Sequence, residues 1–425
     1  MFGYRSAILM GAAVAVAGLQ TASGQEDYFQ RDRNVAVLDR PQPEFDPEPI
    51  RLGSFQARSS FAVGGYYVDN VFATDQNEVS DFAFTFRPTV DVASDWSRHE
   101  VGLNVTAERF EFIDQGSESV TNAQARLRGR ADVNRDWYVT SSAFVRQRNE
   151  PRTQISILDD FGEPVELFQY GGDAFVNYER SRIRGQLGYE YVDTDFDDVQ
   201  GFDPSFPGVD QDFRDVETHT VRGRLSYAVT RDYAVFVQGS YFERDFDTLT
   251  ELSPGVFAVR DSDGFTIEGG INFELQGPFR GDVAVGYLEE DRESPLFGDI
   301  EGLSVDGRLQ WFPTRLTTVT ASASRRTTDV GLVNAAAATS TSGNLRVDHE
   351  LLRNVLLYAQ GGIFETDFSD ADRDDTFFDV GFGSVYKINK RVHLEGFYRY
   401  TNRDSSVLTE EFSQNIVGFE ITLFP

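Results

Sequence analysis

The sequence predicts an all-β protein, a single transmembrane antiparallel up-and-down β-barrel of about 18 strands. Two observations lead to this prediction. Segments in which apolar and polar residues alternate recur along residues 54–424, and a period of two is typical of half-buried strands. Eight short turns at nearly even intervals separate longer, acidic connections, and this order is typical of outer-membrane barrels.

The short turns are centred on Asp95, Arg135, Ser181, Arg231, Pro278, Thr314, Arg353 and Lys390. We expect strands at 54–67, 80–92, 98–112, 120–133, 137–149, 167–179, 183–194, 216–229, 233–244, 264–276, 281–290, 301–312, 316–327, 340–351, 355–366, 376–388, 392–403 and 412–424. The number of segments is even, so both ends of the barrel domain fall on the same side. Barrels of this kind keep short turns in the periplasm and long loops outside the cell.

Alternation alone also fits a water-soluble β-sandwich, whose apolar faces meet in a shared core. One example is the set Phe265, Ile267, Ile271 and Phe273, which would share one face of a strand. The regular repetition of such segments along the chain favours the barrel.

Residues 1–24 carry Arg5, an apolar run and the small residues Ala22, Ser23 and Gly24, which predicts a secretory signal peptide. The apolar run is too short to cross a bilayer as a helix, and no later stretch has the required length. Residues 25–51 are rich in proline, which resists helix formation and ladder pairing. We therefore expect a flexible periplasmic leader over 25–51 and the barrel over 52–425.

Composition restricts the chemistry further. The chain has no cysteine, which excludes disulfides, thiolate metal sites and cysteine nucleophiles. Its formal net charge is −30, which argues against nucleic acid as a partner. We expect an integral protein of the bacterial outer membrane, surrounded by lipid and lipopolysaccharide.

The three tryptophans all lie beside short turns. An aromatic girdle marks each membrane interface of a transmembrane barrel. The residues expected in the inner girdle are Trp96, Trp137 and Trp311.

Arginines concentrate on the polar parity of four strand regions. If the apolar faces contact lipid, a pore-lining basic wall is expected from Arg126, Arg128, Arg130, Arg146, Arg148, Arg182, Arg184, Arg222 and Arg224. Guanidinium groups bind carboxylates and phosphates through paired hydrogen bonds, so such a wall could guide anionic saccharides or other anions. In the alternative interpretation the arginines only satisfy lumen acids such as Glu108, Glu190, Glu268, Glu274, Glu395 and Glu420.

The outer loops are strongly acidic. Their carboxylates include Asp193, Asp195, Asp197, Asp198, Asp370, Asp372 and Asp374. An EF-hand is rejected because Asp375 and Gly381 occupy the places of its glycine and its bidentate glutamate. No metal or other cofactor is therefore assigned, and we expect solvated loops that bind surface cations bridging lipopolysaccharide.

An enzyme is not expected. Outer-membrane hydrolases need a base near a nucleophile or an acid pair. The chain has four histidines, of which His99, His349 and His393 lie near short turns and His219 begins a strand. None of them follows a loop-borne catalytic pattern.

Several strand and turn segments, which together span nearly the whole mature chain, resemble one family. They are Tyr66 to Asp75, Ser80 to Phe82, Asp95 to His99, Ser262 to Phe265, Val285 to Leu288, Pro313 to Val319 and Val347 to Asn354. The chain resembles the β-barrel porin family of alphaproteobacterial outer membranes, some of whose relatives resemble exopolysaccharide secretion proteins. The resemblance implies a porin-like barrel assembled by the outer-membrane insertion machinery, although Pro425 follows the terminal Phe424.

Three functions remain open from the sequence. The first is a porin-like channel for passive passage of small hydrophilic solutes, with homo-oligomers left open. The second is an outer-membrane conduit for exopolysaccharide export. The third is a structural barrel plugged by inward-folded loops, for which 193–215 is the longest candidate.

Overall fold

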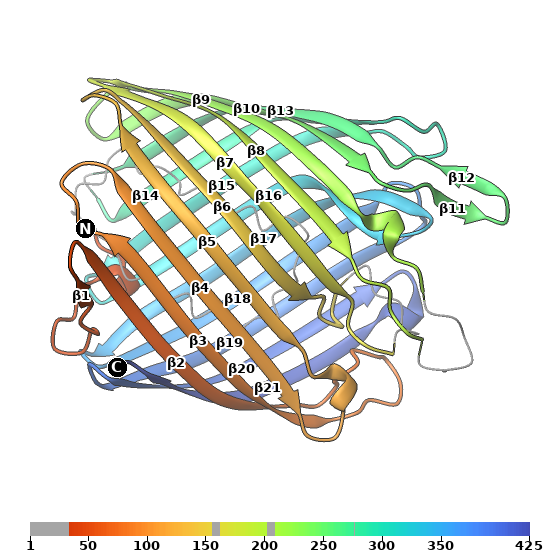
Figure 1. Cartoon of the computed structure of the whole chain (residues 1–425), viewed down its shortest axis with the longest axis horizontal. Helices are drawn as coiled ribbons and strands as arrows, with labels where there is room; N and C mark the ends of the chain where they lie inside the picture. The colour runs from red at the N-terminus through yellow and green to blue at the C-terminus, as the bar shows by residue number, and fades with distance from the viewer. Residues whose placement is uncertain (1–33, 155–161, 202–208, 276) are drawn as a thin grey trace.

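The computed structural model describes residues 34–154, 162–201, 209–275 and 277–425. Eighteen antiparallel strands form one closed barrel, with the first described residues and the C-terminus at the short-turn end (Figure 1). The structure confirms the predicted fold class. By the general rule for such barrels, the short-turn end is periplasmic and the opposite, loop end faces outward.

The barrel strands are β2 (Phe55–Val68), β3 (Asp81–Ser94), β4 (Glu100–Phe112), β5 (Thr121–Asp132), β6 (Trp137–Asn149), β7 (Glu166–Arg180), β8 (Ile183–Phe196), β9 (Val216–Ala228), β10 (Tyr233–Phe246), β13 (Ser262–Glu274), β14 (Phe279–Arg292), β15 (Ile300–Thr314), β16 (Thr317–Leu332), β17 (Ala335–Leu352), β18 (Val355–Phe368), β19 (Asp374–Asn389), β20 (Val392–Ser405) and β21 (Phe412–Leu423). Outside the barrel lie β1 (Ile50–Leu52), the hairpin of β11 (Thr250–Ser253) and β12 (Val256–Ala258), and the 3₁₀ turns η1 (Val37–Asp39), η2 (Gly116–Glu118), η3 (Asp212–Arg214) and η4 (Leu408–Glu410).

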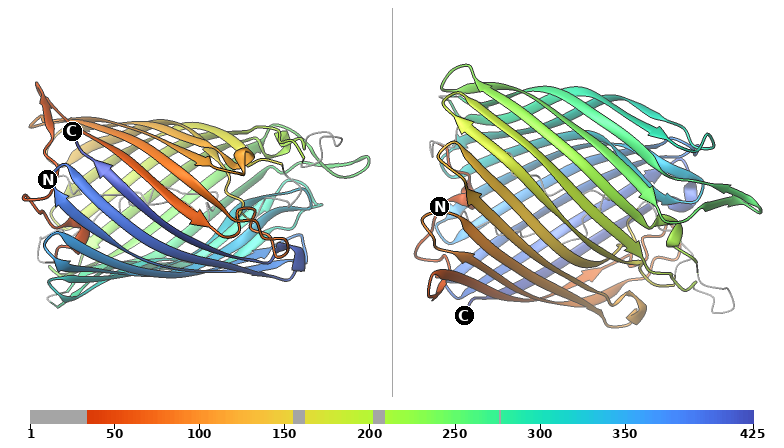
Figure 2. Two further views of the ribbon diagram at one scale, coloured as in Figure 1. Left: turned by 90° about the horizontal axis from the view of Figure 1, so that it is seen from below. Right: turned by 45° about the horizontal axis from the view of Figure 1, so that its top comes forward.

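The first and last barrel strands close the sheet. β2 pairs with β21 from Phe61 opposite Leu423 to Val68 opposite Ile416, and it pairs with β3 along its other edge. The two strands run side by side in both views of Figure 2. Closure leaves no strand edge with unpaired backbone groups facing lipid, where water could not satisfy them.

The two faces of the wall differ as the alternation predicts. The outward face carries exposed apolar side chains such as Leu103, Leu187, Val237, Ile267 and Val285. Inward positions are mostly polar or charged, as the ion pairs described below show. Such an arrangement suits lipid outside and a polar interior.

No helix in the described ranges is both long and apolar enough to cross a membrane.

The largest difference from the predicted strands occurs at one hairpin. The sequence predicts strands ending at 327 and beginning at 340, whereas β16 runs to Leu332 and β17 begins at Ala335. Residues Ala335 to Ala338 are fully buried, so no polar alternation marks this part of the strand. Alternation fails as a signal where both faces of a strand are covered.

The proline-rich leader differs from the unpaired segment that its composition predicts. Its last residues form β1, which pairs with β2 from Ile50 opposite Ala57 to Leu52 opposite Phe55. Val37 packs against the inward-facing Leu356 and Val385, and its amide donates to Thr318 Oγ1 at 2.9 Å.

Charged contacts extend this docking along the turn end. Arg40 pairs with Glu350 at 2.6 Å, and Lys387 pairs with Asp46 at 3.1 Å. Lys390 also pairs with Glu48. Residues 34–49 therefore lie against the inner turn-end rim of β16 to β20, held by side chains more than 250 positions away in the sequence.

A disulfide tests this docking, because the native chain contains no cysteine to compete. We expect Val37→Cys with Leu356→Cys to crosslink on mild oxidation of the refolded barrel, since both side chains belong to one buried cluster. Mass spectrometry of the linked peptides measures the yield.

The matched control combines Val37→Cys with Leu288→Cys, because Leu288 belongs to a buried cluster with Ile300 and Ala337, a loop-end residue. Equal crosslinking in the two variants would show that the leader is not held at the turn end.

Candidate functional site

The predicted basic wall is largely a feature of the lumen face. Exposed Leu127, Val145, Leu187 and Leu225 mark the outward parity of β5, β6, β8 and β9. The opposite parity holds eight of the nine predicted arginines: Arg126, Arg128, Arg130, Arg146, Arg148, Arg184, Arg222 and Arg224. Arg182 instead lies exposed in the turn between β7 and β8.

Most of these arginines have an acidic partner, in several cases on a strand beyond the adjacent one. Four pairs across strands are Arg126 with Asp173 at 3.3 Å, Arg128 with Asp91 at 3.1 Å, Arg222 with Glu190 at 3.0 Å and Arg224 with Asp282 at 2.6 Å. Nearer the turns, Arg130 pairs with Asp132 at 3.0 Å and Arg184 with Glu179 at 2.6 Å. Pairing lowers the cost of holding charges in a confined interior.

The acids expected to neutralise this wall mostly bind elsewhere. Glu190 does pair with the wall. Glu108 and Glu420 both bind Arg87, at 3.1 and 2.7 Å. The remaining carboxylates have other surroundings: Glu268 accepts from Gln238 and Ser304, Glu395 accepts from Tyr358, and Glu274 is buried on β13.

Arg146 and Arg148 differ from their neighbours. Arg146 Nε donates to Gln169 Oε1 at 2.5 Å, and the guanidinium lies over the Phe144 ring. Within the described ranges, no carboxylate lies within 4.0 Å of either guanidinium. The wall is therefore neutralised in most places and keeps excess positive charge on β6.

The hairpin joining β16 and β17 occupies the loop end of the lumen. Its tip, residues 329–338, packs into a buried apolar cluster with Ala73, Phe368, Phe377 and Phe412. Ala73 belongs to the β2–β3 connection, whereas Phe368 ends β18, Phe377 lies in β19 and Phe412 begins β21. We call this tip and the loop residues that contact it the cap.

A buried arginine fastens the hairpin tip from another direction. Arg260, which precedes β13, is fully buried and donates to the carbonyl oxygens of Leu332 at 2.9 Å and Val330 at 2.5 Å. Asp370 Oδ1 accepts from the Gly298 amide at 2.6 Å, and its Oδ2 accepts from the Ala336 amide at 3.4 Å. The connections β12–β13, β14–β15 and β18–β19 thus meet at the tip.

Two buried ion pairs join the remaining connections to the cap. Arg214 pairs with Glu150 at 2.6 Å, and its side chain fills the space beside Gly331 at the hairpin tip. Arg152 pairs with Glu118 at 2.6 Å and lies over the Phe72 ring. Eight of the nine loop-end connections thus contribute a described residue to this network, and the ninth is bordered by Phe412 at the start of β21. The segment 193–215, which the sequence predicts as a plug, supplies Arg214 to this network. The centre of the network is the β16–β17 hairpin.

The predicted inner girdle residues lie on the outer surface beside the turns. Trp96, Trp137 and Trp311 are each about two-fifths exposed. Their ring partners are Phe55 at 5.6 Å, Tyr178 at 4.7 Å and Phe279 at 6.3 Å, respectively. Aromatic side chains with one polar atom suit a lipid–water interface.

Sequence reasoning missed the aromatic band at the opposite end. Tyr170, Tyr241 and Tyr287 face outward near the loop end and donate to Asp193 at 2.9 Å, Asp263 at 3.4 Å and Glu301 at 2.8 Å. For Tyr241 and Tyr287 the sequence carried a signal, because an acid follows two residues later on the same strand parity, at Glu243 and Glu289. The tyrosine band was missed because the predicted girdle was restricted to tryptophan.

The predicted acidic loop residues separate into strand and loop positions. Asp193 and Asp195 belong to β8, and Asp374 begins β19. Asp197 and Asp198 follow β8, Asp370 holds the cap, and Asp372 lies in the β18–β19 connection.

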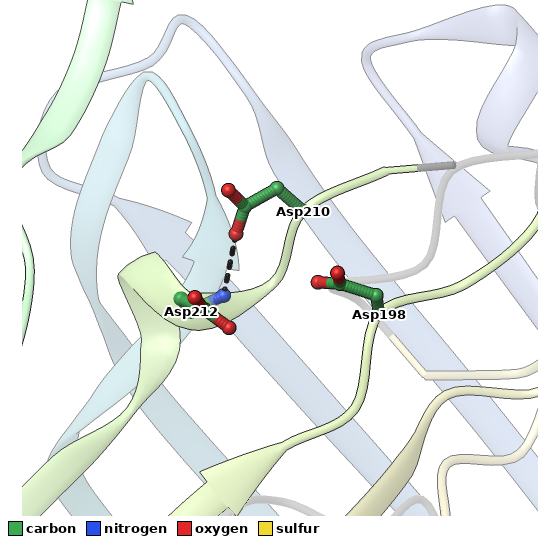
Figure 3. A group of neighbouring side chains, drawn as sticks. All are labelled: Asp198, Asp210 and Asp212. Carbon is green, nitrogen blue, oxygen red and sulfur yellow. Dashed lines mark hydrogen bonds between the residues drawn. The ribbon is translucent and has the colours of Figure 1, made fainter. Parts of the chain in front are cut away.

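Asp198 gathers with two other aspartates near η3. Its carboxylate oxygens, with those of Asp210 and Asp212, lie within 4.8 Å of one another, and all three residues are exposed (Figure 3). Asp210 Oδ1 accepts from the Asp212 amide at 2.9 Å. Calcium takes roughly six to eight oxygen ligands, so this cluster alone does not define a metal site.

A closed antiparallel barrel with lipid-facing apolar strands and a charged lumen defines an integral outer-membrane protein of the porin type. The sequence model of the family described as "Putative beta-barrel porin 2" matches residues 42–424. The chain belongs to this family, and it is an integral outer-membrane β-barrel.

Solved structures align with most of the chain. The copper transporter OprC aligns with a TM-score of 0.50 and 10% identity, covering 89% of this chain and 81% of its own. A BenF-like porin from Pseudomonas fluorescens Pf-5 gives 0.46 and 12%, covering 87% and 99%. OpdK from Pseudomonas aeruginosa gives 0.46 and 13%, with the same coverage. None of the curated proteins matches the sequence.

The buried pair of Arg214 and Glu150 supports the cap. Glu150→Ala leaves an uncompensated charge where both side chains are nearly inaccessible, and such changes cost about 3–5 kcal/mol. We expect faster hydrogen exchange in 150–154, 211–215 and 329–338, with the barrel strands unchanged, measured by mass spectrometry.

The control is Glu111→Ala, because Glu111 pairs with Arg109 on the exposed surface. Surface pairs contribute about 0–1 kcal/mol, so exchange in the cap is expected to remain unchanged. An equal response to the two substitutions would contradict the role given to the buried pair.

The connection between β8 and β9 is expected to loosen as the pH rises. Burial raises the pKa of the Asp215 carboxyl to about 7, although the Phe196 amide that donates to it opposes this shift. An unfolded aspartate has a pKa of about 3.9. The native loop therefore holds an extra proton between these values, and its stabilising effect is complete below about pH 4 and lost as the pH passes 7.

Hydrogen exchange of residues 209–215, corrected for the intrinsic pH dependence of amides, measures this change. Asp215→Asn removes the titrating group and should flatten the profile. A profile that keeps its slope in this variant would assign the pH dependence to another group.

Proposed function

We propose that this protein is an outer-membrane channel for small hydrophilic solutes whose loop end opens when the cap is displaced. The observation that carries the proposal is the charged lumen face of a barrel of eighteen strands. Barrels near this size are wide enough to enclose an aqueous path. Ion pairs such as Arg87 with Glu420 and Arg224 with Asp282 keep the wall polar at widely separated strands.

The cap supports the gated form of the proposal. Arg260 and the apolar cluster around Ala335 hold the hairpin tip among connections that come from both directions around the wall. A hairpin that continues two barrel strands can swing about their ends without breaking the ladder below. Displacement of 329–338 is therefore the simplest route to an open loop end.

A plugged structural barrel is the second candidate, and the same cap contacts favour it. In that case the tip never leaves its site, because Arg260, the buried pair of Arg214 and Glu150, and the apolar cluster all oppose opening. Ion conduction distinguishes the two functions.

Shortening the hairpin tests the proposal directly. Asp329 lies opposite Ala337 in the ladder, so residues 330–336 can be replaced by Asn-Gly, which forms a tight two-residue turn. In planar bilayers we expect brief, infrequent openings of the native protein and a sustained current through the shortened variant.

The control replaces only the turn residues Pro254 and Gly255 of the β11–β12 hairpin, between the paired Ser253 and Val256, with Asn-Gly, and it keeps Leu252 in its contact with the cluster around Ala336. Heat-modifiable migration on gels verifies that each barrel has folded. Equal steady currents in all three proteins would contradict gating by the cap. The absence of current in all three would contradict the channel function.

A further inference from the structure

We infer that Arg126, Arg146 and Arg148 form an oxyanion site in the lumen, just beneath the cap, which selects solutes that carry a carboxylate or a phosphate. The inference rests on the proposed channel and specifies its class of solute. We call these three residues the arginine site.

The strand register brings the three side chains together. On β5 and β6, Arg126 lies directly opposite Phe144 and Gln124 directly opposite Arg146, so these side chains share the lumen face. Arg148 follows Arg146 on the same parity. The guanidinium carbons of Arg126 and Arg146 lie 6.0 and 4.9 Å from the centre of the Phe144 ring, which places one aromatic face beside two cations.

Hydrogen bonds position Arg146 and leave its outer nitrogens available. Its Nε donates to Gln169 Oε1, and Gln169 in turn donates to Thr194 Oγ1 at 2.8 Å. Within the described residues, neither terminal nitrogen of Arg146 has a hydrogen-bond partner. A planar guanidinium held from its Nε side can present two parallel donors to a carboxylate or phosphate.

The local charge is unusual for this lumen. Arg126 is neutralised in part by Asp173 at 3.3 Å, whereas Arg146 and Arg148 have no carboxylate within 4.0 Å among the described residues. Elsewhere on the wall, Arg128 has Asp91 as an acidic partner two strands away, and Arg222 has Glu190 on the adjacent strand. The arginine site is thus a local positive region in a chain of net charge −30.

The position of the arginine site along the lumen suits a role in selecting solutes. Along the lumen parity of β6, Phe144, Arg146 and Arg148 lead to Glu150, which is held in the cap by Arg214. A solute that crosses the loop end therefore meets the arginine site directly below the cap. Half-buried guanidiniums bind anions more strongly than solvated ones, because fewer waters screen the charge.

The test compares Arg146→Gln with Arg148→Gln, singly and together, against a charge-neutral control. The control is Arg224→Gln with Asp282→Asn, which removes an ion pair from the same lumen and leaves the net charge unchanged. Reversal potentials in a KCl gradient are measured in the hairpin-shortened background. Citrate and inorganic phosphate binding are measured separately by calorimetry on the folded protein in detergent.

With Arg146 and Arg148 intact, we expect a preference for chloride and binding of citrate. The double variant is expected to bind citrate about 10- to 100-fold more weakly, which is the range for losing a charged hydrogen-bond partner. The control should keep both properties. Current with no anion preference, or citrate affinity that the double variant retains, overturns the arginine site and leaves the channel standing. Citrate binding without current in any variant supports the site and overturns the channel.

Discussion

The period of two along each strand is the constraint on which this structure depends. In lipid every backbone amide and carbonyl must be paired, so the sheet has to close, as it does between β2 and β21. Once it is closed, each strand has one face toward lipid and one toward the lumen. A slip of one residue would turn Arg126 or Arg224 into the bilayer, at about 2–4 kcal/mol for an arginine at the midplane. The inward charges therefore fix the register as firmly as the outward apolar residues do.

The same constraint concentrates charge inside the barrel, and pairing across strands is how that charge is tolerated. Arg87 on β3 joins Glu108 on the adjacent β4 and Glu420 on β21, which lies beyond β2, and Arg224 reaches Asp282 beyond the adjacent strands. These pairs are formed between residues that the closed sheet brings near, so a single strand would not form them. Polarity of the lumen follows from the fold, whereas the distribution of unpaired charge is specific to this sequence.

The strands could be predicted because each one repeats a local signal, and every predicted segment overlaps one barrel strand. The cap could not be predicted in this way. Ala335 to Ala338 form an unbroken apolar run because loops cover both faces, and Arg260 finds its partners in carbonyl groups some 70 positions away. The docking of the leader could not be predicted from local sequence for the same reason, since Arg40 and Glu350 are 310 positions apart. Parity placed eight of nine arginines in the lumen, but only the pairing of strands separates Arg146 and Arg148 from the neutralised ones.

An acidic protein with a basic site in its lumen poses an apparent electrostatic conflict. The loop end carries exposed clusters such as Asp198, Asp210 and Asp212, which repel anions at close range. Screening at physiological ionic strength limits that repulsion to about 8 Å in solvent. Inside the wall, water is scarcer and screening is weaker, so Arg146 and Arg148 act on a solute more strongly than exposed loop charges at the same distance. We therefore assign selection by charge in the proposed channel to the lumen, and contact with surrounding cations and lipid headgroups stays the expectation for the acidic surface.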